Sequence, residues 1–228
     1  MNQPLTPVVK RLLIACTAIT VALLILKNVQ VEALYTVVRF TVLDPSLFVR
    51  GYLWTLVTYL FIHIDPMHLL FNMLGLYFFG PMFERVWGSR SFFRFLILAG
   101  IGAGLCVVAV GLLVPSWNVP TNGLSGSIVA LLTAFAVMYP EQQVYFYGLL
   151  PIKGKHLILI GIGLDLLFAL AGSNTSLPAH LGGYAMGYLL VTGKWRPSRW
   201  IKGGGGSKPK SGPPYLKVVK PEDGKYLH

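Results

Sequence analysis

The chain has 228 residues, of which 54% are hydrophobic and 12% charged, and its formal net charge is +11. Soluble domains average about 25% charged residues, so this chain has too few charges to cover a water-soluble surface. Nine basic and two acidic residues follow residue 193, which places +7 of the net charge in the C-terminal tail. Basic residues otherwise flank apolar runs, and this arrangement indicates membrane orientation and no nucleic-acid partner.

Six apolar runs predict membrane-spanning helices, and we therefore expect an all-α membrane protein, a polytopic bundle of six transmembrane helices. The runs cover residues 12–26 (extending to 31 at most), 66–83, 92–114, 124–138, 157–171 and 178–192. The first is interpreted as a retained span, because no small-residue cleavage pattern follows it. The fourth and fifth runs are shorter than the roughly 20 residues needed to cross a bilayer, so we expect their ends to lie below the membrane surface.

Between the first two runs lies a long mixed segment, residues 31–65, which contains Arg39, Asp44 and Arg50. It is too polar for a simple span and predicts an interfacial, half-buried element. Asp65 is suited to cap the next helix, with Pro66 in its first turn.

Lysine and arginine in the short loops predict the orientation of the membrane domain, residues 1–202. They place both termini in the cytoplasm, and the residues concerned are Lys10, Arg11, Arg85, Arg90, Lys153, Lys155, Lys194, Arg196, Arg199 and Lys202. Residues 203–228, which begin with Gly-Gly-Gly-Gly-Ser, predict a flexible basic cytoplasmic tail.

Polar residues at the starts of apolar runs are the candidates for chemistry, because polar groups at membrane depth are costly and usually functional. In the predicted topology Ser125, His180 and His68 all begin helices from the outer side. A serine hydroxyl needs a base to take its proton, and histidine can do so near neutral pH. Close approach of two helices is favoured by small residues, here Gly123, Gly126, Gly183 and Gly187.

Acyl transfer also needs hydrogen-bond donors for the developing oxyanion. His68 and Asn72 are four residues apart and therefore share one helical face. Asp165 lies in the fifth run, where a structural role is favoured over orienting His180. His63 is assigned to the interfacial segment. Cys16 and Cys106 lie within apolar runs without metal-ligand spacing, so no metal and no cofactor are expected.

Three motifs together resemble those of the rhomboid family of intramembrane serine proteases: His68-x-x-x-Asn72, Gly123-x-Ser125-Gly126, and Ala179-His180-x-x-Gly183-x-x-x-Gly187. The resemblance covers residues 51–187 and implies the bacterial six-helix type. It implies Ser125 as nucleophile and His180 as general base, in a dyad without an essential acid, with His68 and Asn72 stabilising the oxyanion. The segment before Pro66 is similar to the family's membrane-embedded first loop.

Val129 departs from the resemblance, because some family members carry an aromatic residue there that stacks on the catalytic histidine. Orientation of His180 must then come from another group, for which Tyr184 is a candidate.

The function predicted from these residues is intramembrane serine endopeptidase, acting on single-span transmembrane substrates within membrane lipid. The expected location is a bacterial inner membrane, with the active site open to the outer side. The alternative is a catalytically silent rhomboid-like adaptor that binds transmembrane helices, and a transporter ranks lower because the cytoplasmic halves of the runs are almost wholly apolar. The sequence does not indicate an oligomeric state.

Overall fold

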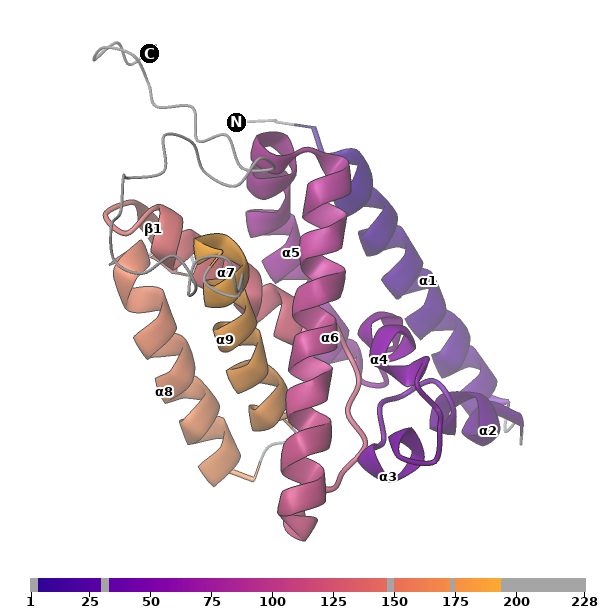
Figure 1. Ribbon diagram of the computed structural model, residues 1–228. Coiled ribbons are helices and arrows are strands. Elements are labelled where there is room, and N and C mark those ends of the chain that lie inside the picture. Colours follow the sequence, from indigo (N-terminus) through magenta and orange to yellow (C-terminus); the bar gives the residue numbers. More distant parts are fainter. Residues whose placement is uncertain (1–3, 30–32, 147–149, 173–174, 194–228) are drawn as a thin grey trace.

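Helices dominate the computed structural model, which describes residues 4–29, 33–146, 150–172 and 175–193. Its six long helices stand side by side as a bundle (Figure 1), and they are α1 (Pro7–Asn28), α5 (Pro66–Trp87), α6 (Ser89–Leu113), α7 (Ser125–Met138), α8 (Leu157–Leu170) and α9 (Leu177–Thr192). Each coincides with one predicted apolar run, with ends that differ by a few residues. The predicted tail and the extension of the first run to residue 31 lie outside the described residues.

Two helices in the described part of the chain, α1 and α6, are long and apolar enough to cross a membrane, judged by length and composition. The α7 helix is apolar but shorter. Large apolar side chains nevertheless cover the outside of the bundle, including Leu170, Leu113 and Phe78, which are 88%, 81% and 68% exposed. A continuous apolar exterior of this kind is expected where a protein faces lipid or a partner.

Carboxylate side chains accept backbone N–H groups at the starts of two helices, α5 and α1. The Asp65 side chain accepts the backbone N–H of His68 at 2.7 Å, and Pro66 occupies the first turn, so α5 begins as predicted. Near the other end of α5, the buried Glu84 carboxylate accepts the N–H groups of Val8 and Val9 at 2.9–3.1 Å. Glu84 thus satisfies donors that the first turn of α1 leaves unpaired and ties α1 to α5.

The segment between α1 and α5 folds into short pieces at one end of the bundle (Figure 1). They are α2 (Ala33–Arg39), α3 (Pro45–Phe48), α4 (Thr55–Thr58) and the 3-10 turn η1 (Tyr59–Phe61). Leu43 and Tyr59 are buried while Tyr35 and Trp54 are exposed, so the segment is half-buried as predicted. Leu43 also exchanges two backbone hydrogen bonds with Thr121, at 2.9 and 2.8 Å, which joins this segment to the chain leading into α7.

A two-stranded antiparallel hairpin, β1 (Gln143–Phe146) and β2 (Leu150–Lys153), stands between α7 and α8 and was not expected in an all-α protein. Its first strand contains the β-formers Val144, Tyr145 and Phe146, which favour strand over helix. Beside the hairpin, Lys155 and Lys153 bond the exposed Glu141 carboxylate at 2.7 and 2.9 Å and hold its pKa down at about 2.

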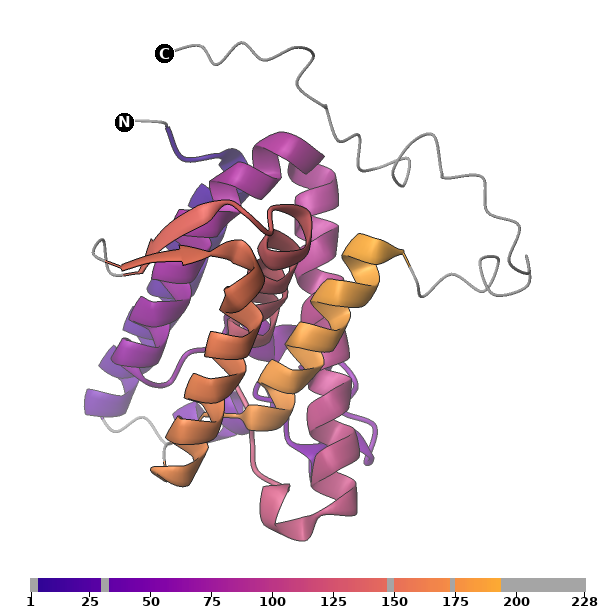
Figure 2. The same ribbon diagram turned by 90° about the vertical axis from the view of Figure 1, so that its left-hand side faces the viewer.

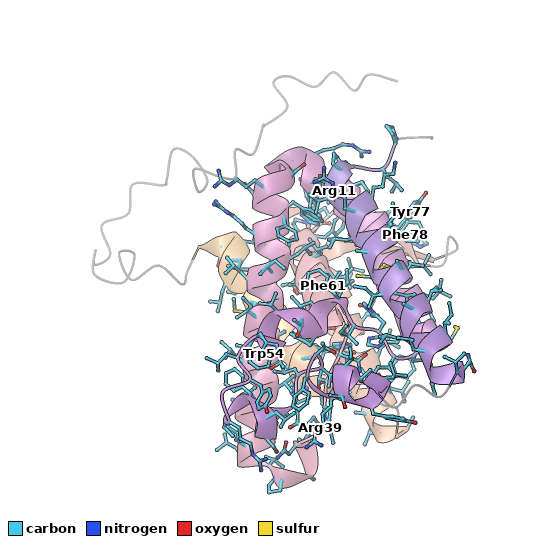
Figure 3. The ribbon with its side chains drawn as sticks, turned by 90° about the vertical axis from the view of Figure 1, so that its right-hand side faces the viewer. Arg11, Arg39, Trp54, Phe61, Tyr77 and Phe78 are labelled. Atoms are coloured by element: carbon cyan, nitrogen blue, oxygen red, sulfur yellow. The ribbon has the colours of Figure 1, made fainter. Side chains whose placement is uncertain are left out.

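The hairpin lies at the end of the bundle where α1 begins (Figure 2). Figure 3 shows Arg11 at that same end and Arg39 at the opposite one. The start of α1 and the hairpin, which contains Lys153, therefore share one end of the bundle, and the segment from α2 to α4 lies at the other.

Candidate active site

The beginnings of α7 and α9 lie against each other at small residues. A Cβ atom on Gly183 would overlap the Gly126 carbonyl, and one on Gly187 would come within 2.6 Å of the Ala130 carbonyl oxygen. Gly126 in turn faces the carbonyl of Ala179. Helix backbones approach this closely only where side chains are absent. Gly126, Gly183 and Gly187 therefore lie where α7 and α9 come closest, and their packing role stays a prediction.

This contact places Ser125 and His180 at neighbouring positions, since each adjoins a residue of the contact. Ser125 is the first residue of α7, and His180 lies in the first turn of α9. Both side chains are half-buried. Within the described residues the two share no hydrogen bond, and in enzymes without bound substrate this bond is often long and tightens when substrate binds.

Gly123 leaves space for the side chain of His68 rather than allowing two helices to pack closely. It precedes α7 with φ of +102°, a conformation that favours glycine. A Cβ atom here would lie 2.5 Å from Cε1 and 2.9 Å from Nε2 of His68. The glycine therefore leaves room for the imidazole directly beside the loop that carries Ser125.

His68 and Asn72 lie one turn apart on α5, as predicted. The Asn72 side-chain amide donates to the His68 carbonyl at 2.8 Å, and Asn72 is only 3% exposed. An amide NH₂ group has two donors, so one remains for another acceptor. His68 also lies close enough to His180 to interact with it electrostatically. The α5 helix therefore reaches the same site as α7 and α9.

His63 belongs to this site, although the sequence analysis assigned it only to the interfacial segment. It is fully buried, its Nε2 accepts the backbone N–H of Leu124 at 3.3 Å, and its ring centre lies 5.4 Å from that of His68. Burial lowers the pKa of His63 to about 4, with a further contribution from nearby His68, so its imidazole is neutral at pH 7. The available signal in the sequence was that His63 lies between Ile62 and Ile64, because a histidine buried among apolar residues needs a polar partner.

The His63 contact also distinguishes the two backbone N–H groups at the start of α7. Because Leu124 N–H is engaged by His63, it is not free for an oxyanion. The N–H of Ser125, at the first position of α7, has no acceptor within its own helix. Ser125 N–H therefore differs from its neighbour Leu124 N–H in having no protein acceptor in the described part of the chain.

Asp165 of α8 reaches the site from the opposite side. Its Oδ1 lies 2.7 Å from Nδ1 of His180, and its Oδ2 accepts the Tyr184 hydroxyl at 3.0 Å. The contact with His180 is the role that the sequence left as the less favoured alternative. The part of the chain that the structure describes contains no group of three metal-ligating side chains.

Comparison with known proteins matches residues 50–197 to the family model described as Rhomboid domain. RHOMBOID-like protein 12, mitochondrial, of Arabidopsis thaliana is 32% identical over 154 residues, or 61% of this chain and 46% of that protein. Rhomboid protease GluP of Bacillus subtilis is 32% identical over 156 residues, covering 68% of this chain and 29% of that protein. Rhomboid protease GlpG of Haemophilus influenzae is 26% identical over 136 residues, covering 60% and 67%.

The chain thus spans less than half the length of the first two relatives. The family model, in contrast, covers well over half of the chain and includes every side chain of the site described above. The protein therefore belongs to the rhomboid family, whose members are integral membrane proteins and whose characterised members are serine proteases.

Proposed function

We propose that this rhomboid protein is an intramembrane serine endopeptidase in which Ser125 attacks a peptide bond and His180 takes the serine proton. The contact of Gly126 with Gly183 carries the proposal, because it brings the starts of α7 and α9 together and so sets a nucleophile beside a base. The names of two bacterial relatives, both rhomboid proteases, support the same activity.

The reaction follows the chemistry of serine hydrolases. As Ser125 Oγ adds to the carbonyl carbon, its proton passes to His180, and negative charge develops on the carbonyl oxygen. His68, Asn72 and the Ser125 N–H are the donors for that oxygen, and each such donor contributes about 2.7–4 kcal/mol in the transition state. His180 then gives the proton to the leaving amine, and water hydrolyses the acyl-enzyme.

The proposed setting is a bilayer crossed by all six long helices, with both termini in the cytoplasm. The end of the bundle that holds α2 to α4 then faces outward, together with the starts of α5, α7 and α9. Figure 1 shows that the chain after α6 rises along the bundle before α7 begins, so α7, whose first residue is Ser125, starts away from the rim of the bundle. The substrates that fit are transmembrane segments of single-span proteins, whose peptide bonds must leave the helix to reach Ser125.

The first prediction concerns Ser125 itself. Purified protein in detergent should cleave a single-span model substrate, and Ser125→Ala and His180→Ala should each lose essentially all cleavage, because nucleophile and base act as one unit. Equal cleavage by wild type and Ser125→Ala would contradict the proposal.

A serine-reactive fluorophosphonate separates the protease from the silent adaptor. Wild-type protein should be labelled at Ser125, whereas Ser125→Ala should not. If folded wild-type protein binds transmembrane peptides but Ser125 is never labelled, the adaptor is the function.

A further inference from the structure

The α8 helix is packed loosely, with one exception. Of its fourteen residues, only Asp165 has a buried side chain, at 7% exposed, while apolar residues such as Leu159 and Leu170 are largely exposed. A buried carboxylate within an apolar helix is costly unless it is fully hydrogen-bonded. The hydrogen-bond partners of Asp165 should therefore explain why a carboxylate is buried in this helix.

Both oxygens of the Asp165 carboxylate are engaged by α9. Oδ1 meets His180 Nδ1 at 2.7 Å, and Oδ2 accepts the hydroxyl of Tyr184 at 3.0 Å. A carboxylate can only accept, so the imidazole proton lies on Nδ1. In the neutral ring Nε2 then keeps its lone pair, which is the state that a base acting on Ser125 requires.

Tyr184 is placed to fix the carboxylate rather than the imidazole. His180 and Tyr184 are four residues apart on α9, and Gly161 and Asp165 are four apart on α8, so each pair shares a face. A Cβ atom on Gly161 would overlap the Tyr184 hydroxyl. Gly161 therefore provides the space in which that hydroxyl can reach Asp165.

Among the groups around His180, the Asp165 carboxylate is the one that forms a side-chain hydrogen bond with it in the described part of the chain. Val129, one turn past Ser125 on α7, carries no aromatic ring that could stack on an imidazole. His68 approaches from α5 and Ser125 from α7, but neither forms a hydrogen bond with His180 in the described part of the chain. The 2.7 Å contact with Asp165 is the hydrogen bond that fixes the ring.

We infer that Asp165 is a positioning residue for His180, held in turn by Tyr184, so that this rhomboid works with an Asp165–His180–Ser125 triad instead of a dyad. The inference rests on the proposed proteolysis at Ser125 and adds two residues to it. It also makes alignment of the base depend on α8 remaining against α9.

The test compares Asp165→Asn and Tyr184→Phe with wild type in detergent, using cleavage kinetics for a single-span substrate and fluorophosphonate labelling to count active molecules. Asp165→Asn keeps the size of the side chain but removes its charge, and should lower kcat on the order of 10- to 100-fold with little change in KM. Tyr184→Phe should lower kcat by a smaller factor, roughly 2- to 10-fold. Tyr77→Phe, an exposed tyrosine on α5, is the matched control and should leave kcat unchanged.

A purely structural role would reduce the yield or thermal stability of the protein without changing kcat per active molecule. A second readout does not depend on the variants folding: NMR of histidine-labelled wild type should show a strongly downfield Nδ1 proton for His180. Wild-type kcat in folded Asp165→Asn, or the absence of that proton, would overturn the triad while Ser125→Ala remains inactive. Cleavage that persists in Ser125→Ala would instead overturn the proposed function itself.

Discussion

Two histidines hold the loop before Ser125 in different ways. His68 lies against Gly123, where only a glycine leaves room for the imidazole. His63 lies deeper, fully buried, and accepts the Leu124 N–H through Nε2. In the proposed mechanism the first is a donor to the oxyanion, whereas the second supports the backbone next to the serine. His63 can accept this hydrogen bond only while its Nε2 is unprotonated. The conformation of the loop before Ser125 should therefore depend on pH.

A pH dependence of stability follows from His63. Burial lowers its pKa to about 4 from the ordinary histidine value of 6.5, so between these values the unfolded chain binds the proton and the folded one does not. Stability should therefore fall as pH drops from 6.5 towards 4, by about 3 kcal/mol in total, since one pKa unit is worth about 1.4 kcal/mol. Thermal unfolding in detergent across this range measures the slope.

The control is His63→Gln, which retains an acceptor for Leu124 N–H but does not titrate. It should unfold with a shallower dependence on pH over the same range. An unchanged slope in His63→Gln would assign the acid sensitivity to other groups.

Among the helices, α7 and α9 form the closest pair around the site. Their glycines allow backbone to meet backbone, so the relative positions of Ser125 and His180 are set by two rigid elements rather than by loops. By contrast, α8 joins the site through a single buried side chain, Asp165. Ser125 and His180 are thus built on a firm contact, and Asp165 is held in place by a weaker one.

Substitution at Gly183 tests the close contact. Gly183→Ala introduces a Cβ atom against the Gly126 backbone, which cannot move aside as a flexible side chain could, so overpacking should cost about 1–3 kcal/mol of stability. The displaced helices should also slow fluorophosphonate labelling at least tenfold. Differential scanning fluorimetry and labelling rates measure the two effects.

Gly163→Ala is the matched control for this substitution. Gly163 is also a helical glycine, but nothing lies within 4 Å of a Cβ atom placed there. It should show wild-type labelling and unchanged or slightly raised stability, because alanine is the better helix former by up to about 1 kcal/mol. Equal behaviour of the two variants would argue against a tight contact of α7 with α9.

At the scale of the whole molecule, charge and apolar surface are arranged along one axis. Arg11 and the hairpin mark one end of the bundle, and Arg39 marks the other (Figures 2 and 3). Exposed apolar side chains cover the flanks between them. This arrangement suits a bilayer, and the proposed orientation puts the short basic loops on the cytoplasmic side.

The proposed orientation can be measured with single cysteines in a background that lacks Cys16 and Cys106. Val119→Cys and Gln142→Cys both introduce an exposed thiol, one in the chain before α7 and one beside the hairpin. In intact cells a membrane-impermeant maleimide should label Val119→Cys, and it should label Gln142→Cys only after permeabilisation. The reverse pattern would invert the topology.

Much of the helical framework was predictable from local sequence. Apolar runs, Asp65 with Pro66, and the basic flanks gave the number and order of the long helices, because these signals lie within a few residues of the element they define. The hairpin at residues 143–153 was missed, since a short loop between two apolar runs offers little periodicity. His63 was missed as part of the site because its partner, Leu124, lies far away in the chain.

By itself, the sequence determined the membrane class and the rhomboid motifs. It also singled out Ser125, His180 and His68 as polar groups at helix starts, with Asn72 one turn beyond His68. Only the tertiary structure decided which of them meet: Gly183 against Gly126, His63 beneath Leu124, and Asp165 on His180. The reason is physical, because composition and spacing describe one helix at a time. A hydrogen bond between two helices depends on their separation and rotation, which packing alone sets.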